Sequence, residues 1–242
     1  MKPAFYTGAS GLIAFQSRLD VVGNNIANSN TIAYKPTTTS FNDLLYTEMY
    51  VNTQNDPLSG HGVKIIGTGI DAEQSNLREG QSTLDLAIIG NGWFCVENGE
   101  KRLYTRDGSF GISLDGEQAY LVNQSGYFVL DANGERISTR VRQGASIDND
   151  ELTQRVGVFG FDYPEALTPV SGNLYSENEL TGEATVLTEG QYELAQGYLE
   201  QSGVSMADEM VNLIAAQRAY QLSARVVQTA DELEQTINSL RA

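Results

Sequence analysis

The stretch that decides the fold lies near the N-terminus, where residues 5–26 read FYTGASGLIAFQSRLDVVGNNI. Every third or fourth residue falls on one stripe, whose members are large and apolar except for a single glycine. The stripe consists of Phe5, Gly8, Leu12, Phe15, Leu19, Val22 and Ile26. Such a heptad pattern keeps one side of an α-helix turned toward a partner. We therefore expect an amphipathic helix that begins near Lys2 or Pro3 and ends between Ile26 and Asn30.

A second stripe with the same spacing occupies the other end of the chain. It consists of Met206, Met210, Leu213, Gln217, Tyr220, Ala224 and Val227, and continues after a small phase shift with Ala230, Leu233, Ile237 and Leu240. Ser205, followed by Asp208, resembles the capping box that starts a helix, with Asp in place of Glu. Each stripe needs a partner, and the simplest partners are each other or the same helices of neighbouring copies. Two ordinary core helices are the alternative, but the middle of the chain is strand-like and does not need them for its own core.

The middle of the chain alternates with period two and is rich in turn signals. Strands are predicted at 64–66, 84–89, 93–97, 101–105, 109–114, 119–122, 127–130, 136–139, 151–161 and 192–196. Dipeptides such as Asn98-Gly99 and Asp115-Gly116 supply the positive φ of hairpin turns. Residues 164–190 look like loops, and 52–62 like a flexible loop. The predicted fold class is α+β, a mainly antiparallel β domain inserted between N- and C-terminal helices that pair as a coiled coil.

The expected organisation has four parts. Residues 1–40 form the N-terminal helix and an extended segment of a helical rod domain, 41–83 a linker region, 84–196 the β-rich domain, and 197–242 the C-terminal helix of the rod domain. The 242 residues are 40% hydrophobic and 19% charged, which is typical of a folded protein. The net charge of −16 argues against nucleic-acid binding, and the lack of a long apolar run argues against membrane insertion. Residues 1–11 lack the apolar core of a secretory signal.

Residues for chemistry are sparse. His61 is the single histidine and Cys95 the single cysteine, so neither a zinc site nor an internal disulfide is expected. Cys95 lies in an alternating strand pattern and is interpreted as a buried hydrophobe. Residues 131–134 echo part of a calcium loop, but the bidentate Glu is not at the required spacing. We expect no catalytic, cofactor-binding or metal site, no small-molecule substrate and no enzymatic activity.

Three long stretches carry a resemblance to a known family. They are residues 10–12, 18–31 and 33–35 near the N-terminus; 84–94, 104–110, 126–127 and 129–130 in the centre; and 197–204, 209–211, 216–220 and 227–232 near the C-terminus. In this order they resemble the signatures of bacterial flagellar rod and hook proteins. The length and the single β insert resemble a proximal or distal rod subunit more than a hook subunit.

The resemblance implies a structural subunit of the flagellar basal body that assembles helically through its terminal helices and transmits torque. It also implies export by the flagellar type III apparatus, and partners that are other copies of the chain and neighbouring rod or hook subunits. The expected assembly interface consists of Leu12, Phe15, Leu19, Val22, Asn24, Asn25, Ile26, Asn28, Met210, Leu213, Gln217, Tyr220 and Val227. Its amides are expected to face neighbouring subunits, because Asn24 and Asn28 are spaced as neighbours on one helical face; simple capping of the first helix is the alternative.

Other functions remain open at this point. A hook subunit of the same family is the first alternative. A carbohydrate-binding or hydrolytic β domain with a helical stalk is a second, although Trp93 and Tyr104 lie in strand patterns that indicate core positions. A soluble adaptor or chaperone for assembly is a third, which fits the acidic charge but not the three-part resemblance.

Overall fold

The computed structural model describes residues 2–48, 58–99, 101–116, 118–140, 149–188 and 190–241. The chain forms two compact units. One unit contains Met1–Ala27, Thr37–Gly69 and Ser205–Ala242, and the other contains Asn28–Pro36 and Ile70–Val204. No helix in the described part of the chain combines the length and the apolar character that a membrane span requires.

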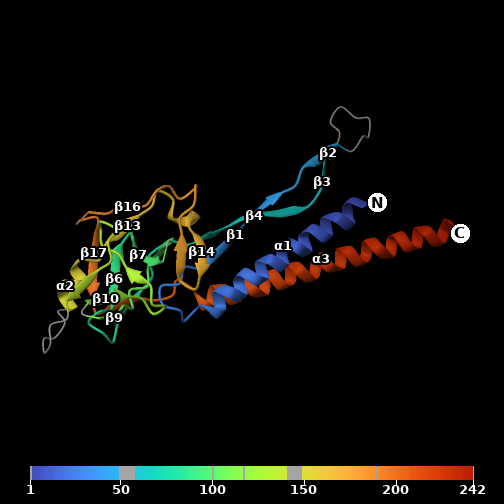
Figure 1. The fold of residues 1–242 in the computed structure, drawn as a ribbon. Coiled ribbons are helices and arrows are strands. Elements are labelled where there is room, and N and C mark those ends of the chain that lie inside the picture. The colour runs from blue at the N-terminus through green and yellow to red at the C-terminus, as the bar shows by residue number, and fades with distance from the viewer. Residues whose placement is uncertain are drawn as a thin grey trace. The chain divides into compact units, whose positions relative to one another are not determined.

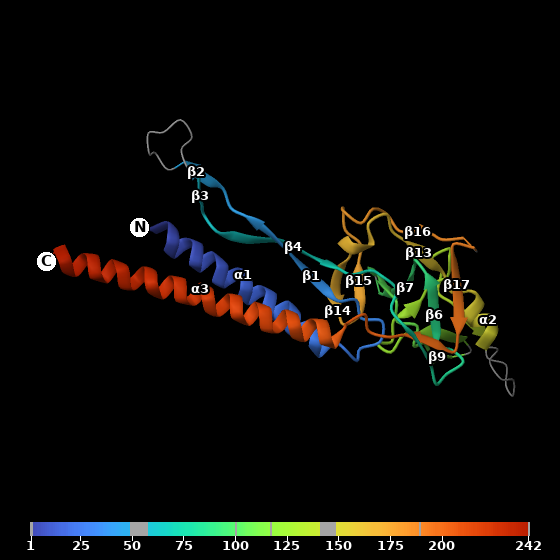
Figure 2. The ribbon, with the colours of Figure 1, turned by 180° about the vertical axis from the view of Figure 1, so that it is seen from behind.

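The first unit is built on two long helices, α1 (Lys2–Ala27) and α3 (Met206–Arg241). They lie side by side in opposite directions, so that the two ends of the chain lie at the same end of the pair (Figures 1 and 2). The direction follows from the contacts, because Gly8 faces Val227 while the Arg18 guanidinium donates to Asn212 Oδ1 at 3.4 Å. Both predicted helices are thus confirmed. At the start of α3, the Asp208 N–H donates to Ser205 Oγ at 3.4 Å, as the predicted cap requires.

A two-stranded ribbon of β1 (Thr37–Asp43) and β4 (Val63–Ile70) belongs mainly to the same unit. It is continued by the pair β2 (Tyr46–Glu48) and β3 (Leu58–Gly60). Every second side chain of β1 is partly covered, and Phe41 meets Phe15 of α1 with ring centroids 5.8 Å apart. Residues 41–83, expected as a linker, therefore hold several strands. Of the predicted 52–62 loop, 52–57 lie outside the described residues and 58–60 form β3.

The second unit is a β domain whose largest sheet has ten strands. Its main path runs β12 (Ser138–Arg140), β10 (Gln118–Val122), β11 (Phe128–Val129), β7 (Trp93–Asn98), β8 (Lys101–Thr105), β15 (Leu174–Ser176) and β14 (Thr168–Ser171). Off this path, β9 (Gly111–Asp115) pairs with β10, and β13 (Val158–Gly160) pairs with β7 and β16 (Thr185–Val186). Two further pairs are β6 (Leu86–Gly90) with β17 (Tyr192–Gln196), and β5 (Leu77–Glu79) with β18 (Tyr198–Glu200). The predicted α+β class with mainly antiparallel strands is confirmed.

Strand β7 lies at the centre of the core because both of its faces are buried. Phe94 and Val96 point into one apolar cluster, while Trp93 and Cys95 point into a second. This is the period-two geometry of a strand that is covered on both sides. The predicted hairpin turns are also found, with Gly99 at φ 65° and Gly116 at φ 63°.

One prediction in this domain is wrong. Residues 151–161 do not form one strand, because the segment begins inside helix α2 (Asn149–Gln154) and only β13 is extended. Leu152 is buried within α2, whereas Val156, beyond the end of the helix, forms an isolated antiparallel bridge with Asp131. Residues 164–190, which were expected to contain loops, also hold a 3₁₀ turn, η1 (Pro164–Ala166), and the strands β14, β15 and β16. Strands of two to four residues are too short for an alternating pattern to be recognised.

Candidate functional site

The α1–α3 contact follows a line close to the predicted stripes but displaced from them. On α1 the line passes through Gly8, Gly11 and Asn25, which are buried. A Cβ built on Gly8 would lie 2.8 Å from Val227 Cγ2, so the glycine lets the two helices approach closely. On α3, Ala216 is the fully covered residue. The real seam thus shares Gly8 with the predicted stripe and adds Gly11 and Ala216, which the stripes do not contain.

The predicted interface residues divide into three groups by exposure. Val22 and Asn25 are buried. Seven are partly covered: Leu12, Phe15, Leu19, Ile26, Asn28, Leu213 and Val227. Four are exposed: Asn24, Met210, Gln217 and Tyr220. The structure therefore brings Asn25 and Val227 into the contact between α1 and α3, through Glu209 and Gly8, and leaves the four exposed residues at the surface of the subunit.

Asn25 is a polar junction within the first unit. Its side chain is 1% exposed, and its amide imitates a peptide group opposite β1. The amide nitrogen donates to Thr37 O at 2.9 Å and to Glu209 Oε1 at 3.1 Å, and Oδ1 accepts from the Thr37 N–H at 3.0 Å. One buried side chain thus joins the end of α1, the start of β1 and the first turn of α3. Asn25 therefore serves the fold of the subunit itself.

Asn28 does not share a helical face with Asn24, because α1 ends at Ala27. It lies in the following turn, where its Oδ1 accepts from Thr31 Oγ1 at 3.1 Å. Its main-chain carbonyl accepts from Ser202 Oγ at 3.0 Å. The second unit therefore joins the segment after α1 to the segment before α3 at this residue.

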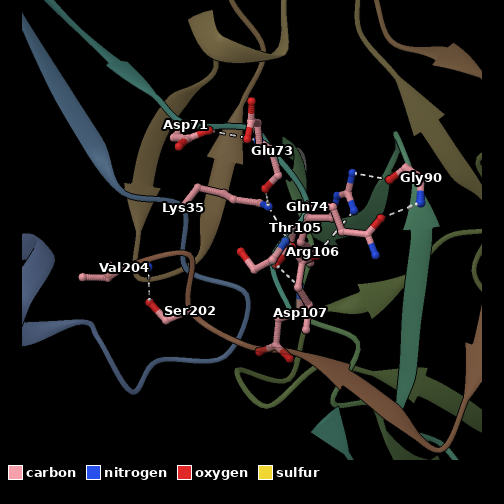
Figure 3. Close-up of polar contacts among 12 residues, drawn as sticks. Lys35, Asp71, Glu73, Gln74, Gly90, Thr105, Arg106, Asp107, Ser202 and Val204 are labelled. Carbon is pink, nitrogen blue, oxygen red and sulfur yellow. Dashed lines mark hydrogen bonds and ion pairs between the residues drawn. The ribbon is translucent and has the colours of Figure 1, made fainter. Parts of the chain in front are cut away.

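The same unit brings the three family-like stretches together at one buried carboxylate. Lys35 comes from the N-terminal stretch, Arg106 from the end of β8 in the central stretch, and Glu200 from β18 in the C-terminal stretch. Their exposures are 1%, 2% and 0%. The Lys35 ammonium lies 2.7 Å from Glu200 Oε1, and Arg106 Nη1 lies 3.4 Å from Glu200 Oε2. Figure 3 shows the Lys35 side chain extended toward Glu73 and Arg106.

Additional hydrogen bonds complete this buried group. Lys35 Nζ also donates to the Glu73 carbonyl, and Arg106 Nη2 donates to the Gly90 carbonyl at 2.8 Å (Figure 3). The Ser75 N–H donates to Glu200 Oε1 at 2.8 Å. The Arg106 guanidinium also lies 5.7 Å from the centre of the Trp93 ring, which allows a cation–π interaction.

The buried group carries more positive than negative charge, because the Lys35 and Arg106 cations share the single Glu200 carboxylate. Burial lowers the pKa of Lys35 and of Arg106 below their ordinary values, and Glu200 partly offsets this in both. Removing one partner of a buried ion pair is strongly destabilising, because the other charge is left uncompensated. The sequence did contain a signal for this group, since each of the three stretches carries one of its members. Periodicity could not show which charges would meet across 165 residues.

The arrangement offers no reactive centre in the part of the chain that the structure describes. No cluster of three or more His, Cys, Asp or Glu residues that could hold a metal ion is found among the described residues. Cys95 is fully buried, and burial raises the pKa of its thiol to about 12. A thiol in this state is a weak nucleophile, so Cys95 is part of the core. The Lys35, Arg106 and Glu200 side chains hold segments together and are closed to solvent.

Comparison with known proteins gives matches over most of the chain. Residues 5–35 match the family described as "Flagella basal body rod protein", 87–167 match "Flagellar hook protein FlgE/F/G D1 domain", and 195–240 match "Flagellar basal body rod FlgEFG protein C-terminal". Two similar curated proteins are called "Flagellar basal-body rod protein FlgG". That of Buchnera aphidicola subsp. Baizongia pistaciae is 34% identical, with 99% of this chain and 100% of the relative covered; that of Bacillus subtilis is 33% identical, with 100% of both covered.

A third relative, "Flagellar basal-body rod protein FlgF" of Mesorhizobium japonicum, is 31% identical over 99% of this chain and 98% of its own length. These matches run across both helices and the β domain. The chain belongs to the flagellar basal-body rod protein family. It is a structural component of the basal body and not an enzyme, and the hook alternative is not favoured.

Proposed function

We propose that this rod subunit assembles with other copies of itself and with neighbouring rod or hook subunits through the outer surfaces of α1 and α3. In this proposal the helices form a coiled-coil-like layer that transmits torque, and the subunit reaches its place through the flagellar export apparatus. The β domain, with its own closed core, needs no help from the assembly to fold.

The observation that carries the proposal is a set of large apolar side chains left uncovered along α3. They are Met210 at 53% exposure, Val211 at 66%, Ile214 at 58%, Leu222 at 61%, Val226 at 45%, Leu233 at 63% and Leu240 at 82%. At 3.6 residues per turn, Val211, Ile214 and Leu222 lie roughly 120–160° around the helix from Ala216, which faces α1. They are therefore too far around the helix to be covered by α1.

Helix α1 adds uncovered apolar side chains of its own, with Tyr6 at 61% and Ile13 at 69% exposure. Large apolar side chains gathered in this number on the surface of two helices are typical of an interaction site. The occupant that fits is another subunit of the same family, because each copy offers the same long apolar helix faces. Contacts between unlike faces of identical subunits propagate as a helical filament when the rotation does not close.

A test needs variants that change the outer face without touching the α1–α3 contact. Ile214→Asp and Leu222→Asp place a charge on exposed positions, where the monomer tolerates it but a subunit interface does not. In a strain that lacks the native protein, we expect each variant to abolish rod assembly and swimming. The purified monomers should melt within a few degrees of the native protein by circular dichroism.

Leu114→Asp is the matched control, because Leu114 is an equally large side chain, 64% exposed, in strand β9. It should support normal motility. Normal rods and motility with both α3 variants would contradict the proposed surface. A comparable loss of motility with Leu114→Asp would show that any added exposed charge is harmful, and would remove the specificity of the test.

A further inference from the structure

The segment that follows α1, residues 28–36, takes a strained path. Ala33 has φ of 54°, and among the described residues it is the one non-glycine with a positive φ. An L-residue with a Cβ adopts this left-handed conformation at an energetic cost, because the Cβ crowds the following carbonyl oxygen. Ala33 is also 0% exposed, so solvent offers its backbone no alternative partner. Such strain persists only where the surrounding contacts impose it.

Several hydrogen bonds hold this segment, among them those from the Gly203 N–H to Tyr34 O and from the Asp71 N–H to Pro36 O, and two further contacts come from Glu200. The Ala33 N–H donates to the Glu200 carbonyl oxygen at 2.9 Å, and two residues later Lys35 Nζ lies 2.7 Å from the Glu200 carboxylate. The strained residue and its neighbour are thus held by the main chain and the side chain of one residue. The Lys35 N–H, which donates to Tyr175 Oη at 3.2 Å, adds a third contact from strand β15.

The two cations differ in how firmly they are attached to the β domain. Arg106 lies at the end of β8, donates to the Gly90 carbonyl, and stacks against Trp93, so it is fixed by the sheet itself. Lys35 sits on a segment without regular secondary structure, and burial without full compensation lowers its pKa. If Glu200 loses its charge, Arg106 keeps its contacts with Gly90 and Trp93, whereas the Lys35 ammonium loses its counter-charge beside the strained backbone.

We propose that Glu200 is a positioning residue that holds residues 28–36, called here the 28–36 linker, in place against the strain at Ala33. The 28–36 linker is then a two-state element, which opens without unfolding of the β core. This inference goes beyond assembly into a rod, since it concerns a property of the single subunit. The opened linker would exchange the left-handed turn at Ala33 for an ordinary conformation. The Glu200–Arg106 pair, β18 and β5 would stay in place.

Residue-resolved hydrogen exchange on the full-length monomer tests the proposal, since it measures local opening against global unfolding. The linker reporter is the Lys35 amide. The core reporters are the amides of Leu121 and Leu130, which donate to Ile137 O and Cys95 O. In Glu200→Gln, we expect exchange at Lys35 to accelerate at least about tenfold more than exchange at the core reporters, because the buried ammonium loses its counter-charge.

Ala33→Gly is the complementary variant, because it relieves the backbone strain and leaves the contacts of Glu200 with residue 33 and Lys35 intact. We expect it to slow exchange at Lys35 by about two- to fivefold, since the relief exceeds the entropy cost of glycine. Lys35→Met covers the case in which Glu200→Gln fails to fold, because it leaves Glu200 and Arg106 as a balanced pair. In that variant the Ala33 amide should exchange faster while Leu121 and Leu130 stay unchanged.

Two results would overturn the inference. Equal acceleration at the linker and the core, in Glu200→Gln or in Lys35→Met, would show that these residues are simple core contacts of one cooperative unit. Unchanged or faster exchange at Lys35 in Ala33→Gly would show that no strain is held at this position. Neither result depends on whether the subunit assembles, so failure here is separate from failure of the proposed interface.

Discussion

The β domain and the helical unit differ in how many of their apolar side chains are buried within the subunit. The sheet buries Trp93 at 2% and Phe94 at 0% exposure on opposite faces of β7, within two apolar clusters. In α3, which has 36 residues, Ala216 is the one buried side chain among those described. Helices draw most of their stability from tertiary packing. The comparison shows that the β domain buries an apolar core of its own, whereas most of the α3 surface stays uncovered within the subunit.

The largest expected effect comes from breaking the β domain at Gly108. A Cβ at this position would lie 1.8 Å from the Leu86 carbonyl oxygen, and this atom belongs to the backbone and cannot move aside. Gly108→Ala should therefore lower the free energy of unfolding by about 3 kcal/mol or more, at the extreme of overpacking effects. Gly111→Ala is the control, because a Cβ added there would meet nothing within 4 Å. Denaturant unfolding followed by Trp93 fluorescence measures both, and equal midpoints would refute the prediction.

Alkaline pH should weaken the β domain strongly. Burial raises the pKa of Cys95 from 9.0 to about 12, and raises the pKa of Tyr104 and Tyr175 above their ordinary value of 10.0. Above these ordinary values the unfolded chain releases protons that the folded domain retains, so stability falls as pH rises. Each group contributes about 1.4 kcal/mol per pH unit within its window. Lys35, whose pKa is lowered, acts in the opposite direction below pH 10.5.

Cys95→Ala separates one of these contributions from the others. Between pH 9 and 12 its stability should decline less steeply than that of the native protein, by about 1.4 kcal/mol per pH unit. Urea unfolding at half-unit pH steps measures the two slopes. Parallel slopes would mean that the buried thiol does not contribute to the pH dependence.

The helical unit should respond more weakly, and in a way that depends on which glycine is changed. Gly8→Ala adds a Cβ 2.8 Å from Val227 Cγ2 and should lower stability by about 1 kcal/mol, because overpacking outweighs the gain in helix propensity. Gly23→Ala has nothing within 4 Å and should stabilise α1 by about 0.5–1 kcal/mol. Helical ellipticity during thermal melting distinguishes them, and a shift of the same sign in both would be inconsistent with the close contact at Gly8.

The smallest expected effect concerns the exposed ion pair between Arg136 and Glu97. This pair lies in the β domain, which also contains the buried ion pairs of Glu200. Arg136 Nε lies 2.5 Å from Glu97 Oε2, with side-chain exposures of 45% and 26%. Glu97→Gln should change stability by less than about 1 kcal/mol, because solvent screens the pair and Arg136 keeps its place over the Phe128 ring. Unfolding with and without added salt at about 1 M measures the difference, which should shrink as salt is added. An effect as large as that of Glu200→Gln would contradict the role assigned to burial.

The sequence predicted both helices, most hairpins and the fold class, because each depends on local periodicity or turn chemistry. The helix contact was predicted only in part. Gly11 and Arg18 lie along the real seam, and a search for large apolar residues cannot select a glycine or a cation; Asn25 was expected in the interface between subunits and lies instead between elements of one subunit. Asn25 shows the reason clearly, since its position depends on hydrogen bonds to Thr37 and Glu209 from distant parts of the chain. The Glu200 cluster was not predicted for the same reason.

The hydrogen bond between Ala33 and Glu200 closes the β domain at its base, where the chain enters and leaves it. A segment whose two ends are joined can grow without moving what lies outside it, because the cost of a longer loop rises only slowly with its length. A Cβ added at Gly116, between β9 and β10, would meet nothing within 4 Å, and Asp115 and Gln118 are exposed. Extra residues, an epitope or a small reporter domain inserted there would leave the spacing between the two ends unchanged. The domain is thus a suitable place to label a rod subunit while the helices keep their native sequence.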